Sequence, residues 1–216
     1  LLVDPQEILE PIFANGEILI AVHAEDQTRL RQRREEFANI HDVAIHSQIQ
    51  DSQTALIATQ RALKLSKKYR RRLHILHMST AEEANLMRQE KPGWVTCEVT
   101  PQHLLLNTTA YEEIGSFAQM NPPLRTSHDN EVLWQALLDG VIDFIATDHA
   151  PHTLEEKKQD YPKSPSGMPG VETSLPLMLT AAAQGRCTVA QVVNWMSTAV
   201  ASAYSIPNKG AIAPGY

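Results

Sequence analysis

The sequence has little of several features that would place it in a special class of protein. Only two cysteines occur among its 216 residues, Cys97 and Cys187, so we expect no disulfide scaffold and a reducing compartment. Basic residues do not exceed acidic ones, and the formal net charge of −6 argues against a nucleic-acid partner. No apolar run approaches the roughly 20 residues that span a bilayer, and no signal peptide opens the chain. These absences favour a cytoplasmic globular protein without a membrane partner.

Apolar runs alternate along the chain with amphipathic helical stretches. Buried strands are predicted over residues 17–23, 72–78, 94–99 and 141–147. Helices are predicted over residues 27–39, 51–68, 79–90, 127–140, 171–184 and 188–204. The third of these helices is expected to open with a capping box, with Ser79 three residues before Glu82. Strands that alternate with helices predict an α/β fold with a parallel sheet, whose functional groups gather at the carboxyl ends of the strands.

Three residues of metal-ligand type stand where predicted strands end. They are His23 in "IAVHAED", His77 in "HILHMST" and Asp148 in "IATDHAPH". A lone histidine at a strand end is more often a hydrogen-bonding residue, but three such residues converge if the strands are parallel neighbours. Side chains alternate along a strand, so we assign His77 and Asp148 to the site and leave His74 and His149 as packing or supporting groups.

Two further polar segments have two interpretations each. In "TCEVTPQHLLL", Pro101 is expected to break the strand, so that Glu98 is either a solvent-facing acid or a ligand, and His103 either starts a loop or joins the site. The rigid loop "MNPPLRT" presents Asn121 and Arg125, and such a loop either positions a ligand or merely turns the chain.

At this point the residues resemble a known family. The run Ala146-Thr147-Asp148, one residue, Ala150-Pro151-His152, four residues and Lys157 resembles the signature of the dihydroorotases. "IAVHAED", "HILHMST", "TCEVTPQHL", "MNPPLR" and "SGMPGVETSLPLML" also look like dihydroorotase segments, in the family's order and over nearly the whole chain. Hydantoinases and allantoinases share the two strand-end histidines and the strand-end aspartate, but they typically lack the "APH" that follows it.

The resemblance implies a (β/α)8 TIM barrel of the metal-dependent hydrolase type. Residues 1–205 would be its second half, with strands 5 to 8, and residues 206–216 the truncated start of a small β-sandwich domain. The chain begins without a methionine, within an apolar run, as a cut chain would. The family's His-x-His pair, its substrate-binding arginine and its carboxylated lysine have no match here, so the metal site is expected to be incomplete.

The resemblance also implies a role for each metal ligand. His23 and His77 would bind the more buried of two zinc ions, and Asp148 would bind the other. Asp148 would also act as the general base and pass the proton to the leaving nitrogen. In some family members the residues matching Glu98 and His103 take part in an additional metal site.

The substrate-binding residues follow in the same way. His152 would hold the carboxylate of the substrate. Backbone groups near Asn121, Ala150 and Gly167 would fix the pyrimidine ring. An anionic substrate explains a histidine beside the site of an otherwise acidic protein.

Three functions therefore remain open. The first is a zinc-dependent dihydroorotase, which interconverts N-carbamoyl-L-aspartate and L-dihydroorotate in pyrimidine synthesis and acts as a homo-oligomer. The second is another cyclic amidohydrolase, a hydantoinase or an allantoinase. The third is a non-catalytic dihydroorotase-like domain that scaffolds a carbamoyltransferase partner, although a scaffold has no use for convergent ligands.

Overall fold

A computed structural model describes residues 3–216 and contains one parallel sheet. Its four strands are neighbours in chain order, and they are β1 (Ile20–Val22), β2 (Leu73–Ile75), β3 (Val95–Val99) and β4 (Phe144–Ile145). Ile20 pairs with Leu73, and Leu73 pairs in turn with Val95. The predicted parallel α/β arrangement is therefore confirmed, although each strand is shorter than the sequence pattern indicated.

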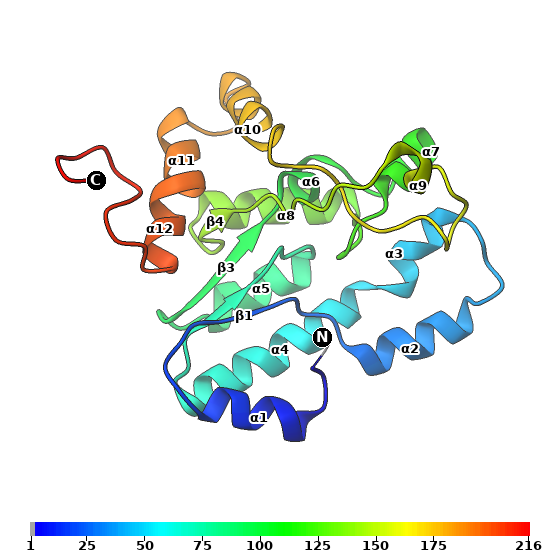
Figure 1. Ribbon diagram of the computed structural model, residues 1–216, viewed down its shortest axis with the longest axis horizontal. Helices are drawn as coiled ribbons and strands as arrows, with labels where there is room; N and C mark the ends of the chain where they lie inside the picture. Colours follow the sequence, from blue (N-terminus) through cyan, green and yellow to red (C-terminus); the bar gives the residue numbers. More distant parts are fainter. Residues whose placement is uncertain (1–2) are drawn as a thin grey trace.

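Helical crossovers connect the strands (Figure 1). The helices are α1 (Gln6–Ala14), α2 (Gln27–Glu36), α3 (His46–Ile49), α4 (Ser52–Tyr69), α5 (Ala81–Glu90), α6 (Pro101–Leu105), α7 (Ala110–Ile114), α8 (Ser127–Leu138), α9 (Leu154–Lys157), α10 (Ser174–Ala183), α11 (Val189–Val193) and α12 (Ala199–Ala203). Short 3-10 turns cover Val43–Ile45 and Gly115–Ala118, and a π-helical turn at Asn194–Thr198 joins α11 to α12. Helices α1 and α4 lie near β1, whereas α10, α11 and α12 lie at the other end of the sheet (Figure 1).

The core lies between one face of the sheet and the helices. Leu73, Ile75, Val95, Cys97 and Val99 are at most 2% exposed and belong to one apolar cluster. Each buried aliphatic side chain of this kind contributes about 1.5–3 kcal/mol. Side chains alternate along a strand, so the intervening residues of β2 and β3, such as His74, are directed to the opposite face of the sheet.

The capping box of α5 begins one residue later than predicted. The Thr80 hydroxyl accepts a hydrogen bond from the Glu83 backbone N–H at 3.1 Å, and Glu83 Oε2 accepts one from the Thr80 N–H at 3.3 Å. The prediction that paired Ser79 with Glu82 is therefore wrong. Ser79 and Glu82 have the same three-residue spacing as Thr80 and Glu83, so the sequence could not separate the two pairs. The Ser79 hydroxyl instead accepts a hydrogen bond from Arg125 Nε at 3.2 Å.

Of the two alternatives for His103, the start of a loop is excluded, because the residue lies within a helix. Thr100 caps α6 by accepting from the His103 backbone N–H, and Pro101 is the first helical residue. Proline suits that position because the first turn of a helix has no internal partner for its N–H groups. The strand thus ends because a helix begins.

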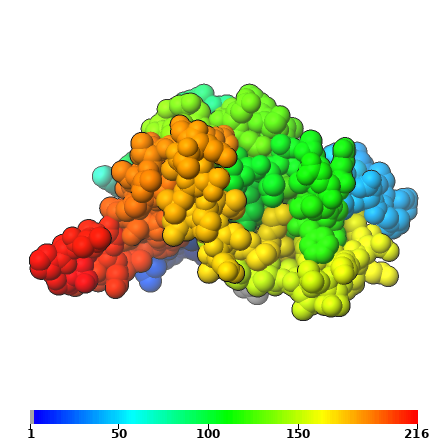
Figure 2. Space-filling model, turned by 90° about the horizontal axis from the view of Figure 1, so that it is seen from above, coloured from blue at the N-terminus to red at the C-terminus, as the bar shows by residue number. Residues whose placement is uncertain are grey.

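Residues 206–216 follow α12 as a series of turns and bends and protrude from the body of the molecule (Figure 2). The division of the chain at residue 205 stays a prediction. Among residues 3–216, no helix combines the length and apolar character needed to cross a bilayer.

Candidate active site

The predicted ligands follow three of the strands directly. His23 is the first residue after β1, and His77 and Asp148 lie two and three residues beyond β2 and β4. The backbone φ angles of His77 and Asp148 are +34° and +44°, in the left-handed region that costs a non-glycine residue about 1–3 kcal/mol. Two of the three predicted ligands therefore have backbone strain, which is a common property of functional sites.

The imidazoles of His23 and His77 face each other. Nδ1 of His23 lies 3.0 Å from Nε2 of His77, and the ring centroids are 4.7 Å apart in an edge-to-face arrangement. The other ring nitrogen of His23 lies 2.7 Å from Glu25 Oε2. A carboxylate on the far nitrogen is the usual support of a metal-bound histidine, since it fixes the tautomer and turns the lone pair toward the metal. This donor set fits a metal ion held between the two rings.

The surroundings of the two rings set their protonation. Burial, together with the neighbouring His23, lowers the pKa of His77 well below its usual value, so this ring is neutral as a metal ligand must be. Burial opposes protonation of His23, but the hydrogen bond and charge of Glu25 outweigh it and raise its pKa. Nδ1 of His77 is buried without a hydrogen-bond partner. The neutral ring of His77 suits a metal ligand, whereas Glu25 favours the charged form of His23.

Asp148 completes the set of strand-end residues. Burial and the nearby Glu98 raise its pKa, and His23 lowers it. Among residues 3–216, no three His, Cys, Asp or Glu side chains form a group that could hold a metal ion by themselves. A catalytic zinc normally takes about three protein ligands. The expectation of an incomplete metal site stays a prediction.

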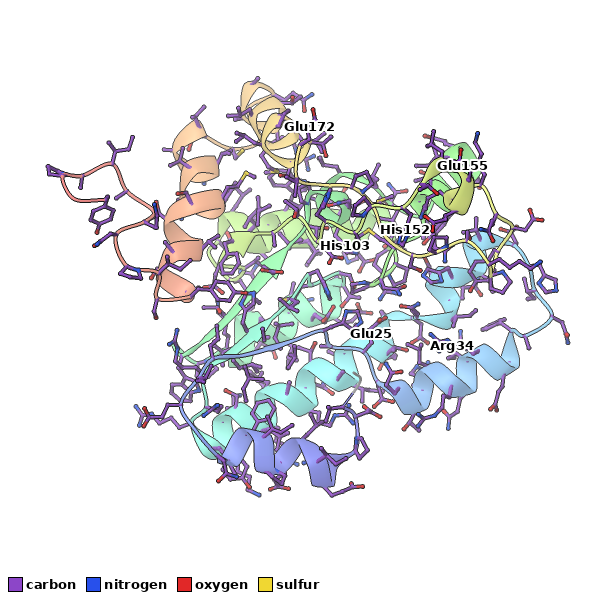
Figure 3. The ribbon with its side chains drawn as sticks, viewed as in Figure 1. Glu25, Arg34, His103, His152, Glu155 and Glu172 are labelled. Atoms are coloured by element: carbon purple, nitrogen blue, oxygen red, sulfur yellow. The ribbon has the colours of Figure 1, made fainter. Side chains whose placement is uncertain are left out.

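The residues predicted to bind substrate come together on the loop after β4. A Cβ atom on Gly167 would lie 2.5 Å from the Ala150 carbonyl oxygen and 3.2 Å from His152 Nε2. The Ala150 N–H donates to the Met168 carbonyl at 3.0 Å, which joins the two segments. Figure 3 shows His152 and Glu25 in the same central part of the molecule. Ala150, His152 and Gly167 are therefore one cluster.

Asn121, on the loop before α8, is oriented by contacts with its neighbours. Its Oδ1 lies 2.9 Å from Nε2 of buried His46, and the same His46 nitrogen lies 3.1 Å from the Met120 carbonyl oxygen. A polar cavity of about 280 Å³ adjoins these groups, with Arg34, Gln119, Tyr161 and Ser166 among its other lining residues. The rigid loop "MNPPLRT" thus presents an oriented polar side chain beside a cavity.

Glu98 and His103 are each engaged elsewhere. Oε2 of Glu98 lies 3.0 Å from His74 Nε2. The two ring nitrogens of His103 lie 2.8 Å from the Thr100 hydroxyl and 3.0 Å from the Pro122 carbonyl oxygen. Burial lowers the pKa of His103 to about 4. These contacts give no support to an additional metal site, which stays a prediction.

His74 and His149 have supporting contacts, as the sequence indicated. His74 is fully buried and stacks on Phe144 with ring centroids 4.8 Å apart. Nδ1 of His149 accepts from the Gly170 N–H at 3.0 Å. The alternation argument does not extend as far as His77, however, because β2 ends at Ile75 and the backbone then turns.

Sequence reasoning missed Glu25, which is 7% exposed and supports His23. Its position was visible in the sequence, two residues after the strand-end histidine and between the predicted strand and the predicted helix. Arg125 was noted only as a loop residue. It is 5% exposed and donates to Ser79 and to the backbone carbonyl of Gln50, so it joins the segments that follow β1 and β2.

A parallel α/β sheet with ligand-type residues at its carboxyl edge is typical of a TIM-barrel hydrolase, and family comparison agrees. The model of the amidohydrolase family matches residues 12–216, so the chain belongs to that family. Members of this family are generally metal-dependent.

Individual relatives define the resemblance more closely. The chain is 38% identical over 204 residues to the dihydroorotase of Methanosphaera stadtmanae, with 91% of this chain and 46% of the relative covered. It is 37% identical over 202 residues to the dihydroorotase of Halobacterium salinarum, with 94% and 46% covered. The chain thus spans about half the length of the curated relatives it matches.

The fold of this chain matches about half of several solved structures. The dihydropyrimidinase of Brevibacillus agri has a TM-score of 0.90 and 28% identity, with 98% of this chain and 49% of that chain covered. The L-hydantoinase of Arthrobacter aurescens has a TM-score of 0.89 and 34% identity, with 96% and 49% covered. The fold is therefore part of a barrel of this type, as the sequence resemblance implied, and its place as the second half stays a prediction.

Proposed function

We propose that this chain carries part of the active site of a dihydroorotase, which interconverts N-carbamoyl-L-aspartate and L-dihydroorotate. The observation that carries the proposal is the 3.0 Å approach of His23 Nδ1 to His77 Nε2, beside the cluster of Ala150, His152 and Gly167. Sequence similarity to dihydroorotases from two archaea supports the choice of substrate. Hydantoinases and allantoinases typically lack the "APH" segment that contributes Ala150 and His152 to this cluster.

In this proposal His23 and His77 hold one zinc ion, and Asp148 is a ligand of a second. When bound, zinc lowers the pKa of a water molecule and polarises an amide carbonyl, which a resistant cyclic amide requires. Among residues 3–216, no third His, Cys, Asp or Glu side chain joins this pair. Glu25 keeps the His23 ring in the tautomer whose Nδ1 is free to bind.

Asp148 moves the proton. Its carboxylate takes the proton of the attacking water and delivers it to the ring nitrogen that is released. Burial raises the pKa of Asp148, which makes its carboxylate a stronger proton acceptor than an ordinary aspartate. The strained φ of +44° turns this residue out of the strand direction at the end of β4.

The loop clusters bind the rest of the substrate. The Nε2 atom of His152 lies 3.1 Å from the Ser166 carbonyl oxygen, so the ring has a fixed orientation beside Gly167. From there the imidazole binds the substrate carboxylate, and the backbone near Ala150, Gly167 and Asn121 binds the ring amide groups. Assembly into a homo-oligomer and docking of a carbamoyltransferase remain predictions.

A hydantoinase activity is the second candidate, because the solved L-hydantoinase of Arthrobacter aurescens shares this fold with a TM-score of 0.89 and 34% identity. The test is zinc-dependent turnover of dihydroorotate, hydantoin and allantoin, measured on this chain and on a chain that also includes the preceding half of the barrel. We expect the longer chain to have the highest kcat/KM for dihydroorotate. A preference for hydantoin or allantoin would contradict the proposal and favour the second candidate.

A further inference from the structure

Lys157 is a buried cation that the proposed chemistry does not use. Its residue is 5% exposed, and it forms no ion pair with any carboxylate among residues 3–216. Instead its ammonium group donates to three backbone carbonyl oxygens, those of Gln119 at 3.0 Å, Pro165 at 2.9 Å and Gly167 at 3.1 Å. An ammonium group has three N–H donors, so all of them are satisfied.

The three carbonyls belong to the two loops that carry the predicted substrate-binding backbone. Gln119 lies two residues before Asn121, and Pro165 lies two residues before Gly167. The loops also bind each other directly, because the Gly167 N–H donates to the Gln119 carbonyl at 2.9 Å. The Gln119 side chain donates to the Ser164 carbonyl at 3.0 Å and accepts from the Ser164 hydroxyl at 2.7 Å.

Lys157, the last residue of α9, is bound through its backbone as well as through its side chain. The Ser116 hydroxyl donates to the backbone carbonyl of Lys157, while the side chain reaches the junction of the two loops. In the space-filling view the segment around α9 lies against the segment around α7 (Figure 2). Lys157 thus joins three segments that are distant in sequence.

A cation at this place is expensive unless it has a specific task. Burial lowers the pKa of Lys157 to about 8, which reflects the cost of removing the ammonium group from water. An apolar side chain of similar length would avoid that cost. The same three carbonyl oxygens exclude a carboxylated lysine here, since its anionic head would face three acceptors.

We propose that Lys157 is a positioning residue that fixes the backbone of Gly167 relative to the Asn121 loop and thereby sets the affinity for the cyclic substrate. The proposal rests on the proposed function. It acts on binding rather than on the chemical step, because the junction is built from loops and does not touch His23, His77 or Asp148. A displacement of about 1 Å in such a site is enough to cost a large factor.

The test compares Lys157→Met and Lys157→Arg with a matched control, Lys158→Met, in the chain that includes the preceding half of the barrel. Lys158 is exposed and is the C-cap residue of the same short helix. We expect Lys157→Met to raise KM for dihydroorotate about tenfold while kcat stays within about twofold. Arginine keeps the charge but has a planar head, so it should not restore KM. The control should leave both constants unchanged.

Amide hydrogen exchange without substrate provides a second measurement that does not depend on turnover. Lys157→Met should speed the exchange of the Gly167 amide, which donates to Gln119, relative to the control. Unchanged exchange, or a fall in melting temperature with KM unchanged, would contradict the positioning role. Restoration of KM by arginine would also contradict it, since charge alone would then suffice.

The experiment also distinguishes failure of the proposed function from failure of the Lys157→Met variant to fold. If the unmodified protein prefers hydantoin or allantoin, the proposed function fails, and the positioning role is judged by the same KM criterion on that substrate. If Lys157→Met does not fold, Gln119→Leu removes the side-chain bonds to Ser164 at the same junction while leaving Lys157 in place. A raised KM in that variant supports the proposal, and an unchanged KM contradicts it.

Discussion

Nδ1 of His23 and Nε2 of His77 lie 3.0 Å apart, although 54 positions separate the two residues. The parallel register explains this approach, because it places Ile20 opposite Leu73 and so brings the ends of β1 and β2 together. Glu25 then fixes the outer nitrogen of His23 at 2.7 Å. The pair is a product of strand register and of one buried carboxylate.

Replacement of Asp148 by alanine should abolish turnover. The substitution removes both a metal ligand and the group that moves the proton, and the latter alone is worth about 10²- to 10⁴-fold in rate. Steady-state kinetics of the chain with the restored barrel half measure the loss. Asp139→Ala is the matched control, because Asp139 is exposed and pairs with Arg88 on the helical side. Turnover of the Asp148 variant near the unmodified level would contradict the assignment.

Replacement of His152 by alanine should chiefly raise KM. A lost charge-assisted contact with the substrate carboxylate costs about 1–3 kcal/mol, while the groups that carry out the chemistry stay in place. His128→Ala, an exposed histidine on α8, serves as the control. If KM of the His152 variant equals that of the control, His152 does not bind the carboxylate.

Gly167→Ala should damage both stability and binding, whereas Gly93→Ala should be tolerated. Gly167 has a φ of +140°, and its new Cβ would overlap the Ala150 carbonyl, but a Cβ on Gly93 would meet nothing within 4 Å. We expect the free energy of unfolding to fall by about 1–3 kcal/mol for Gly167→Ala and to change by about 0.5 kcal/mol or less for Gly93→Ala. Denaturant unfolding measures the free energy of unfolding of each variant. Equal stability of the two variants would show that the loop shifts freely.

Stability should depend on pH through Asp51, the N-cap of α4. Its carboxylate accepts from Arg29 Nε at 2.8 Å, and although burial opposes ionisation, the hydrogen bonds from Arg29 and Thr54 lower its pKa to about 2. A carboxyl whose folded pKa is depressed stabilises the protein above its unfolded pKa of about 4, and this contribution is lost as the pH falls toward 2.

Asp51→Asn keeps a capping oxygen but removes the charge. At pH 7 its free energy of unfolding should be about 1–2 kcal/mol below that of the unmodified protein, and the difference should vanish near pH 2. Asp42→Asn, at an exposed cap of a short 3-10 turn, is the control. A difference that stays constant between pH 7 and pH 2 would show that the charge of Asp51 is not responsible.

Strand order and the strand-end ligands could be predicted because both depend on local patterns. Apolar runs and helix signals fix the alternation of elements, and parallel neighbours must bring their carboxyl ends together. Helices α6 and α9 were not predicted, because each is short and is defined by a threonine cap, at Thr100 and Thr153, rather than by an apolar repeat. Short elements of this kind carry too few residues to show a period.

The supporting groups of the site could not be predicted from spacing. Glu25, Arg125 and Lys157 are charged residues that the pattern would place at the surface, yet each is at most 7% exposed. Their burial depends on partners up to 75 positions away, such as the Gln50 carbonyl that accepts from Arg125. Only the three-dimensional arrangement shows that these partners exist.

The most direct test of the account is to locate zinc by anomalous X-ray diffraction in crystals of the protein grown with the metal. We predict a zinc ion bonded to His23 Nδ1 and to His77 Nε2 at about 2.0–2.1 Å, with Glu25 still on the far nitrogen of His23. Zinc bound elsewhere, with the two imidazoles still hydrogen-bonded to each other, would contradict the assignment of this pair as metal ligands.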